Sequence, residues 1–199
     1  GNCEIYSTSA IPNSKNIMLS SVGAAGFVND NDSIINCRFY DFAAYGIQLS
    51  DYSNGWVISG NSLYNTATVN YVSDVAFIKI SSLNAIAASH QVTNNYFGGT
   101  AANCQGNAMS AGYFSTFSFI DITGKAVVSN NYFRRVRLYN GSNSINNSVV
   151  NFILARLVPA QVTYVIDNNY FGSSSLSDSL HVSSNSSSVD MEVNGISMI

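Results

Sequence analysis

The sequence predicts an all-β fold, built as a solenoid of about six stacked coils, and two observations predict it. A phrase with one apolar residue, two central asparagines and a final aromatic recurs at residues 92–97, 128–133 and 166–171, with a looser copy at 58–63. A short segment with alternating apolar residues precedes each copy. Repetition at intervals of a few dozen residues is typical of architectures in which each unit buries its apolar face on its neighbours.

The spacing within the phrase requires a bend. Val92 and Phe97 are five residues apart, so a straight strand would place them on opposite faces. A bend at Asn94 and Asn95 returns both to the interior and turns Asn95 inward at the corner. Weaker copies at 35–39 and 191–196 complete the series. The inward corner positions are then Cys37, Asn61, Asn95, Asn131, Asn169 and Asn194. Stacked strands would hold them about 4.8 Å apart, close enough for a ladder of amide hydrogen bonds.

The segments before the corners predict the remaining strands. In each of these three-residue segments, one apolar residue stands before the central residue and one after it: 17–19, 47–49, 78–80, 120–122, 152–154 and 180–182. Each coil therefore has three short strands and three corners. The connections 64–76, 98–118 and 134–150 are much longer than the others, and each follows the third strand of its coil. We expect them to form one lobe of loops on coils 3 to 5, beside the first sheet.

The composition favours strands and argues against several functions. Apolar residues make up 46% of the chain and charged residues only 10%, while 32 serines and 26 asparagines supply most of the polar surface. Serine and asparagine compete with the helical backbone for hydrogen bonds, which disfavours a helical protein. The net charge is −3, and one short basic run gives a nucleic-acid partner little support. No apolar run has the length of a membrane span.

Residues 1–199 are expected to form a single domain with a continuous core. Solenoids need polar caps at their ends, but no capping helix precedes Ile5 and the last residues, 196–199, are largely apolar. We therefore expect either a fragment of a longer chain, with further coils, or a partner over the end, as in a homotrimer. The cysteines are too few and too far apart to predict a disulfide framework or a zinc site.

The inward corner asparagine, its aliphatic and aromatic neighbours and the coil length resemble the right-handed parallel β-helix of the pectin-lyase-like superfamily. The resemblance covers nearly the whole chain and implies an architecture more than an activity. The superfamily includes polysaccharide lyases, glycoside hydrolases, phage tailspikes and adhesins. In its enzymes a sugar chain usually lies in a groove over the first sheet, flanked by loops. The motifs of polygalacturonase-like enzymes are absent, and the eleven acidic residues are too scattered for the calcium cluster of pectate-lyase-like enzymes.

The candidate catalytic residues come from the central, outward-facing positions of the first strand in each coil. The predicted outward row is Met18, Gln48, Lys79, Asp121, Ile153 and His181. Lys79 and Asp121 would be neighbours on the groove floor, where Asp121 could serve as an acid, a base or a calcium ligand. The alternative is an ion pair that contributes little. A glycosidase needs a second carboxylate, for which loop position makes Asp51, Asp74 and Asp178 candidates.

Eight side chains are candidates for contacts with a sugar chain. They are two members of the outward row, three arginines and three tyrosines: Gln48, His181, Arg134, Arg135, Arg137, Tyr96, Tyr132 and Tyr170. The arginines could pair with carboxylates of an anionic polysaccharide, or form a solvated strand end. The tyrosines, on consecutive coils, would be either a platform for sugar rings or a ladder that stiffens the sheet.

No cofactor is evident in the sequence, with calcium as the one alternative. Residues 29–33 alternate oxygen-bearing side chains around Asp30 and Asp32, which is weakly similar to a calcium loop. A solvated turn explains the same pattern. No other metal ligands are predicted.

Two functions follow from these expectations. The leading hypothesis is a secreted or cell-surface β-helix that binds a polysaccharide in a groove over the first sheet, and cleaves it if it is a lyase or glycoside hydrolase. The alternative is a structural or adhesion module without catalysis of its own, such as a segment of a virion tailspike or a surface adhesin. The superfamily resemblance supports both, since a fold does not imply a function.

Overall fold

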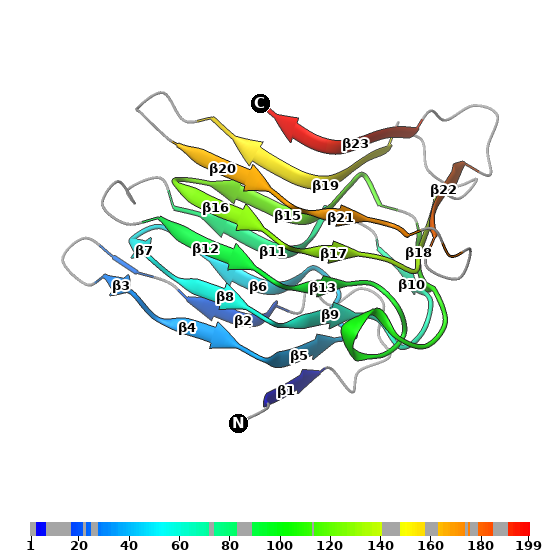
Figure 1. Cartoon of the computed structure of the whole chain (residues 1–199), viewed down its shortest axis with the longest axis horizontal. Helices are drawn as coiled ribbons and strands as arrows, with labels where there is room; N and C mark the ends of the chain where they lie inside the picture. The colour runs from blue at the N-terminus through cyan, green and yellow to red at the C-terminus, as the bar shows by residue number, and fades with distance from the viewer. Residues whose placement is uncertain are drawn as a thin grey trace.

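The computed structural model describes residues 3–6, 17–21, 23–24, 28–71, 74–82, 89–112, 114–140, 148–157, 163–173, 175, 179–184 and 191–199. These residues form strands, apart from connections and one short 3₁₀ helix, η1 (Ala102–Cys104). The strands pair in parallel within every sheet, and Figure 1 shows them stacked from the N-terminal to the C-terminal end. The predicted all-β, solenoid-like arrangement of parallel strands is confirmed.

Three sheets correspond to the three predicted strand positions. Sheet 1 contains β2 (Ile17–Ser21), β6 (Tyr45–Leu49), β11 (Val75–Ser81), β15 (Thr116–Thr123), β19 (Ser148–Arg156) and β23 (Met191–Met198). Sheet 2 contains β4 (Ser33–Ile35), β8 (Val57–Ser59), β12 (His90–Thr93), β16 (Ala126–Ser129) and β20 (Tyr164–Asp167). Sheet 3 contains β1 (Cys3–Tyr6), β5 (Cys37–Tyr40), β9 (Ser62–Tyr64), β13 (Tyr96–Phe97), β17 (Tyr132–Phe133) and β21 (Tyr170–Phe171).

A fourth parallel sheet consists of three segments that the sequence predicted as loops and of one segment, 180–184, that it predicted as a strand of the first sheet. Sheet 4 contains β10 (Val69–Asn70), β14 (Met109–Gly112), β18 (Val136–Asn140) and β22 (Leu180–Ser184). Met109, Val136 and Leu138 of this sheet are fully or almost fully buried. The long connections on coils 3 to 5 are therefore partly core-forming strands, and the expectation of a lobe of loops is wrong for these segments. A further two-stranded sheet pairs β3 (Asn29–Asp30) with β7 (Ser53–Asn54).

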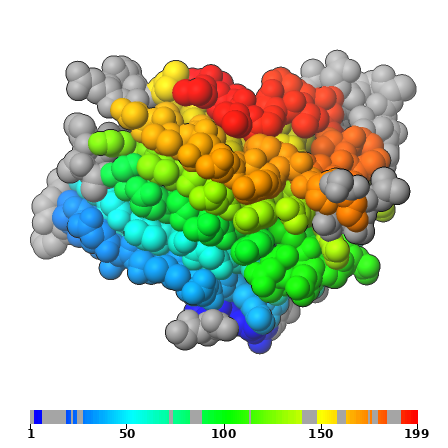
Figure 2. Space-filling view, in the orientation of Figure 1, coloured from blue at the N-terminus to red at the C-terminus, as the bar shows by residue number. Residues whose placement is uncertain are grey.

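Stacked layers are visible on the molecular surface. In Figure 2 bands of successive colour run across the molecule, each against the band before it. In Figure 1 the strands of sheets 2 and 3 follow one another across the front, with sheet 1 behind them. Each turn of chain therefore contacts the turns before and after it, as in other repeat proteins.

At the corner between sheets 2 and 3, the first asparagine of the phrase adopts a left-handed conformation and the second turns its side chain inward. Asn94, Asn130 and Asn168 have φ angles of 58°, 56° and 50°, and Gly60 has a φ of 68° at the equivalent position. Asparagine and glycine are the residues that best tolerate this left-handed conformation. The following residue then turns inward, and Asn95 is completely buried.

Inward asparagines are hydrogen-bonded from one turn to the next. Asn61 donates its backbone N–H and its side-chain Nδ2 to Oδ1 of Asn95, both at 3.0 Å. Asn95 makes the same two bonds to Asn131, and Asn131 makes them to Asn169. Each Nδ2 also donates to a carbonyl of the preceding turn, as Asn95 does to Ile58. We call these four residues the amide row.

Asn194 does not belong to the amide row, which corrects the sequence prediction. It lies in β23 of sheet 1, where its register partner is Asn151, and its Nδ2 donates to Oδ1 of that residue at 3.1 Å. The phrase at 191–196 keeps only its apolar ends and one asparagine, and it forms one uninterrupted strand rather than a corner.

Phenylalanines fill the space between sheets 1 and 3. Phe97, Phe133 and Phe171 stack face to face on consecutive turns, with ring centroids 4.9 and 5.0 Å apart. Phe119 from sheet 1 meets Phe97 and Phe133 edge on. This core fixes which strand face points outward, and so determines the two surfaces described next.

Candidate functional site

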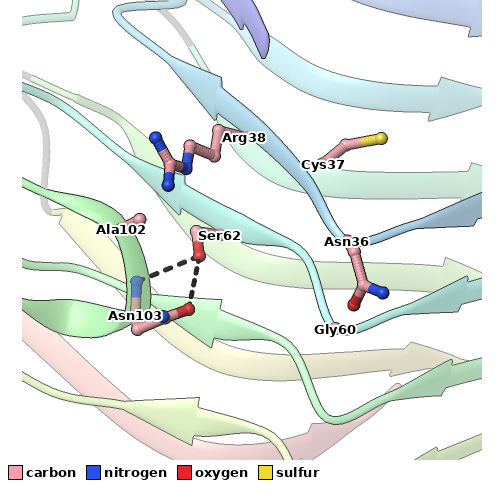
Figure 3. A pocket seen from close by; sticks show the side chains of 7 residues that line it. All are labelled: Asn36, Cys37, Arg38, Gly60, Ser62, Ala102 and Asn103. Carbon is pink, nitrogen blue, oxygen red and sulfur yellow. Dashed lines mark hydrogen bonds between the residues drawn. The ribbon is translucent and has the colours of Figure 1, made fainter. Parts of the chain in front are cut away.

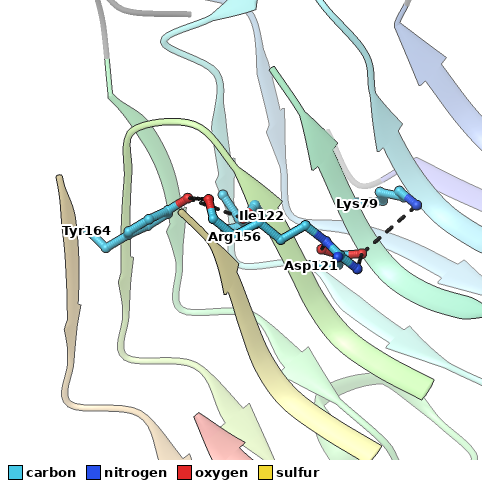
Figure 4. A network of polar contacts seen from close by, with 5 residues as sticks. All are labelled: Lys79, Asp121, Ile122, Arg156 and Tyr164. Carbon is cyan, nitrogen blue, oxygen red and sulfur yellow. Dashed lines mark hydrogen bonds and ion pairs between the residues drawn. The ribbon is translucent and has the colours of Figure 1, made fainter. Parts of the chain in front are cut away.

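The first candidate surface is the outward face of sheet 1 around Asp121. Lys79 and Asp121 are register partners in β11 and β15, as the sequence predicted, with Nζ and Oδ2 4.0 Å apart. The sequence did not predict the main partner of Asp121. Arg156 donates Nε to Oδ1 at 2.8 Å and a second guanidinium nitrogen to Oδ2 at 3.2 Å. Figure 4 shows the carboxylate held between Arg156 and Lys79.

This two-pronged arginine contact occupies both carboxylate oxygens. Asp121 is only 5% exposed, and its hydrogen bond raises the pKa of Arg156. Tyr164 of sheet 2 donates its hydroxyl to the carbonyl of Arg156 at 2.6 Å, and burial raises the pKa of Tyr164. Such an arrangement fixes the position of Arg156 and leaves Asp121 poorly placed to exchange protons with a substrate.

The outward row around Asp121 differs from the predicted row at three positions. Gln48 lies beside Lys79 as expected. In β2 the register partner of Gln48 is Ser20 rather than the predicted Met18. In β19 the register partner of Asp121 is the buried Leu154 rather than the predicted Ile153. The sequence does not reveal the position in β19 because residues 152–155 are all apolar and all buried, so their pattern does not show which of them occupies the outward row. His181 is not in this row, because β22 belongs to sheet 4.

No second carboxylate joins Asp121 in its row. Its register partners on either side are Lys79 and Leu154. Of the loop candidates, Asp74 accepts a hydrogen bond from the backbone N–H of Thr116 at 3.1 Å. Asp178 lies outside the described residues.

The second candidate surface is the outward face of sheet 3. The register of its strands aligns one column of side chains: Glu4, Arg38, Ser62, Tyr96, Tyr132 and Tyr170. The three tyrosines stack with centroid separations of 5.1 and 4.8 Å and interplanar angles of 10° and 7°. We call this set of six residues the outer column.

Stacking determines what the tyrosines offer to a ligand. Both faces of the Tyr132 ring are covered by Tyr96 and Tyr170, so a sugar cannot stack on it. The ring edges and hydroxyls remain, and none of the three hydroxyls has a hydrogen-bond partner among the described residues. The guanidinium of Arg134 is also close to this ring, with its central carbon 5.1 Å from the Tyr132 centroid. The geometry therefore favours the ladder over a platform of ring faces.

The predicted arginine cluster divides between two environments. Arg135 has a φ of 53° and donates to the carbonyl of Gly106 at 2.6 Å, which ties it to the loop that follows β13. Arg137 is exposed in β18 and is the register partner of His181 in sheet 4. Arg134 is therefore the member of the cluster that accompanies the outer column.

The outer column leads into a hollow of about 200 Å³, which the sequence did not predict. Figure 3 shows its lining of Asn36, Cys37, Arg38, Gly60, Ser62, Ala102 and Asn103. The short helix η1 covers one side, because Ser62 Oγ accepts from the backbone N–H of Asn103 at 3.0 Å and lies 3.1 Å from its Oδ1. Among the described residues, the Asn36 amide has no partner, whereas one nitrogen of Arg38 is engaged by Glu4 at 2.6 Å.

A second tyrosine stack also escaped the sequence analysis. Tyr6, Tyr40 and Tyr64 lie two residues after the outer column in β1, β5 and β9, with centroids 4.9 and 5.1 Å apart. Tyr40 and Tyr64 come directly after two weaker copies of the phrase, at 35–39 and 58–63, and Tyr6 belongs to no copy. The outward face of sheet 3 therefore has aromatic stacks at both ends.

In the predicted calcium loop, the carboxylate of Asp30 accepts hydrogen bonds from protein groups. Oδ1 of Asp30 accepts from the backbone N–H and Nδ2 of Asn54, both at 2.9 Å. Within the described part of the chain, no group of three or more histidine, cysteine, aspartate or glutamate residues could hold a metal ion. In the same part, no helix is long and apolar enough to cross a membrane.

Comparisons with known proteins returned nothing similar to this chain. No protein-family model matches it, and neither curated proteins nor solved structures provide a match. Its function must therefore be inferred from the two surfaces described above.

Proposed function

We propose that this protein is an extracellular, polysaccharide-binding β-helix, secreted or held at a cell surface. In this proposal the solenoid is right-handed, has about six coils in register through its inward asparagines, and is similar to the pectin-lyase-like superfamily. The outer column with its hollow supports the proposal best. It places polar and aromatic groups at intervals of one strand, about 5 Å, along a line, which suits a linear polymer of repeated units.

The chemistry of the hollow suits a sugar ring. Its polar side chains are two neutral amides, one hydroxyl and the Arg38 guanidinium, and the unpartnered Asn36 amide can both donate and accept. Small-molecule sites combine a concave shape with a few convergent polar groups of this kind. Tyrosine edges and the Arg134 guanidinium would contact the following units of the chain.

Binding is better supported than cleavage. Glycoside hydrolysis generally requires two carboxyl groups about 5–10 Å apart. Asp121 is engaged by Arg156 through both oxygens, and its neighbours in the outward row are not acidic. We therefore assign the Asp121 cluster to the stability of sheet 1, with the outward face of that sheet as the competing binding site.

The test is a binding screen against neutral and uronate-containing polysaccharides, followed by variants of each surface. We expect Asn36→Gly, which retains the left-handed conformation at this position, to weaken binding, and Gln48→Ala to leave it unchanged. The reverse result would place the ligand over sheet 1. Absence of binding to every polysaccharide, by a protein that unfolds cooperatively, would reject the proposal. Release of reducing ends or unsaturated products would reject the assignment to binding alone.

The second candidate is a structural or adhesion module, such as a tailspike segment in a virion. Large apolar side chains exposed at the C-terminal end favour it, among them Phe171 at 40%, Ile196 at 49% and Met198 at 55%. Contiguous exposed apolar surface often marks a protein interface. Light scattering decides between the candidates, since a stable trimer is expected only for the module.

A further inference from the structure

Two cysteines continue the amide row towards the N-terminus, in the two turns that precede Asn61. Cys3 and Cys37 are register partners in β1 and β5. The backbone N–H of Cys37 donates to Oδ1 of Asn61 at 2.9 Å, which is the bond that Asn61 itself makes to Asn95. The position that holds asparagine in the following four turns thus holds a thiol in both β1 and β5.

The register of the pair satisfies the Cα separation that a disulfide requires. Register partners in parallel strands lie about 4.8 Å apart, and the Cα atoms of disulfides are usually about 4.4–6.8 Å apart. Both side chains leave their strands at the same position of the row. Cys37 lies at the border of the hollow in Figure 3, and it packs against the edge of the core.

Exposure differs between the two thiols. Cys3 is exposed, whereas Cys37 is partly buried and its thiol donates to the carbonyl of Ile35 at 3.4 Å. Burial, and next the neighbouring Cys3 thiol, raise the pKa of Cys37. An oxidant in solution therefore reaches Cys3 first, and Cys37 is positioned to complete the reaction.

Cys104 provides a natural comparison. It is buried, and its thiol lies 3.4 Å from the carbonyl of Phe97 in β13. Strand β9 lies between β5 and β13, so Cys104 is not adjacent to either of the other two thiols.

We propose that Cys3 and Cys37 form a disulfide that fastens β1 to β5 when the protein meets a small-molecule disulfide such as oxidised glutathione. The Cys3 thiolate attacks one sulfur of the oxidant and one glutathione thiolate leaves. The Cys37 thiolate then attacks the Cys3 sulfur of this mixed disulfide and releases the second glutathione. The two protein thiols lose two protons, which the two glutathione thiolates take up, and one S–S bond is exchanged for another.

Such a bond has a clear structural consequence. Among the described strands, β1 pairs with β5 alone, and the Arg38–Glu4 ion pair that also connects these two strands is exposed on both sides. The disulfide would close a long loop of chain, and restricting the unfolded state in this way stabilises a protein. Extracellular conditions are those in which such bonds persist.

The test uses the reduced protein incubated with oxidised glutathione, then unfolded and alkylated. We expect one labelled cysteine, Cys104, an intact mass lower by two hydrogens, and a peptide linking Cys3 to Cys37. Cys104→Ser should retain the link, and Cys37→Ser should stop at a glutathione adduct on Cys3. Persistent labelling of both residues, or a bond to Cys104 or to another chain, would overturn the proposal.

Thermal unfolding gives a second readout. The oxidised protein should unfold several degrees above the reduced protein, with no such difference for Cys37→Ser. Equal midpoints for the linked and reduced protein would overturn the fastening role. Neither result depends on whether the protein binds a polysaccharide.

Discussion

Asn131 accepts two hydrogen bonds at a single Oδ1 atom from Asn95, one from the backbone N–H at 3.0 Å and one from Nδ2 at 3.1 Å. Both residues are completely buried. The bond therefore joins the polar groups of two consecutive turns in a region without water to replace them. Repeated from Asn61 to Asn169, it holds the corners of sheets 2 and 3 in register.

Replacing Asn95 by alanine should destabilise the protein by about 3–5 kcal/mol. The substitution removes the acceptor for Asn61 and the donor to Ile58, and each buried group left without a partner costs roughly 1–3 kcal/mol. Denaturant unfolding measures the loss. Asn169→Ala is the comparison at the half-buried end of the row. It removes the equivalent bonds to Asn131 and Val128, but water can reach this end more readily, so we expect a smaller loss of about 1–3 kcal/mol. Equal losses for the two variants would contradict a cooperative row.

Sequence alone predicted the parts of the fold that local chemistry dictates. The pair Asn94–Asn95 encodes a left-handed bend and an inward amide within two residues, and the distance from Val92 to Phe97 requires that bend. The prediction that Asn194 is an inward corner residue was wrong, because a single asparagine between apolar residues is equally compatible with a continuous strand. The strand Met109–Gly112 could not be recognised, because it is short and its neighbours resemble those of a loop.

The candidate sites were predictable only in part, because they depend on register across long separations. Lys79 and Asp121 occupy equivalent places in two copies of one pattern, so their pairing could be predicted. Arg156 is the register partner of Thr123 and reaches Asp121 along a diagonal. The repeated sequence pattern does not indicate a diagonal contact of this kind, so the pairing of Arg156 with Asp121 could not be predicted. The hollow likewise depends on the fold of η1 back over Ser62.

Asp121→Asn should lower stability by about 1–3 kcal/mol, because it weakens a charge-assisted contact with both prongs of Arg156. Chemical denaturation measures this change. Glu4→Gln is the control, since it breaks the exposed pair with Arg38 and should cost at most about 1 kcal/mol. Polysaccharide binding should be unaffected by Asp121→Asn. A loss of binding in a folded variant would return Asp121 to the group of functional residues.

His90 should make the protein sensitive to acid. Its side chain is completely buried in β12, and neither ring nitrogen has a well-formed hydrogen bond. Burial lowers the pKa of His90 to about 4, and the nearby Ser53 carbonyl and Asp30 charge offset only part of this effect. The unfolded chain, with its histidine pKa near 6.5, binds the proton more readily.

The contribution of His90 is therefore fully present above pH about 6.5 and is lost as the pH falls towards about 4, with a total on the order of 3 kcal/mol. Unfolding curves collected across this range measure the slope. His90→Gln should flatten it, whereas His181→Gln, at an exposed position, should retain it. An unchanged slope in His90→Gln would show that other groups cause the acid sensitivity.

The tyrosine stack allows binding and stability to be separated. Tyr132→Phe keeps the ring between Tyr96 and Tyr170 and removes only a hydroxyl that has no partner among the described residues. Stability should therefore hardly change, while affinity for a bound polysaccharide should fall by roughly 5- to 10-fold, as expected for about 1 kcal/mol of hydrogen bonding. Tyr132→Ala should lower both. Tyr45→Phe in sheet 1 is the control and should leave affinity unchanged. If Tyr132→Phe retained full affinity, the stack would be structural, and the ligand contacts would be confined to the hollow.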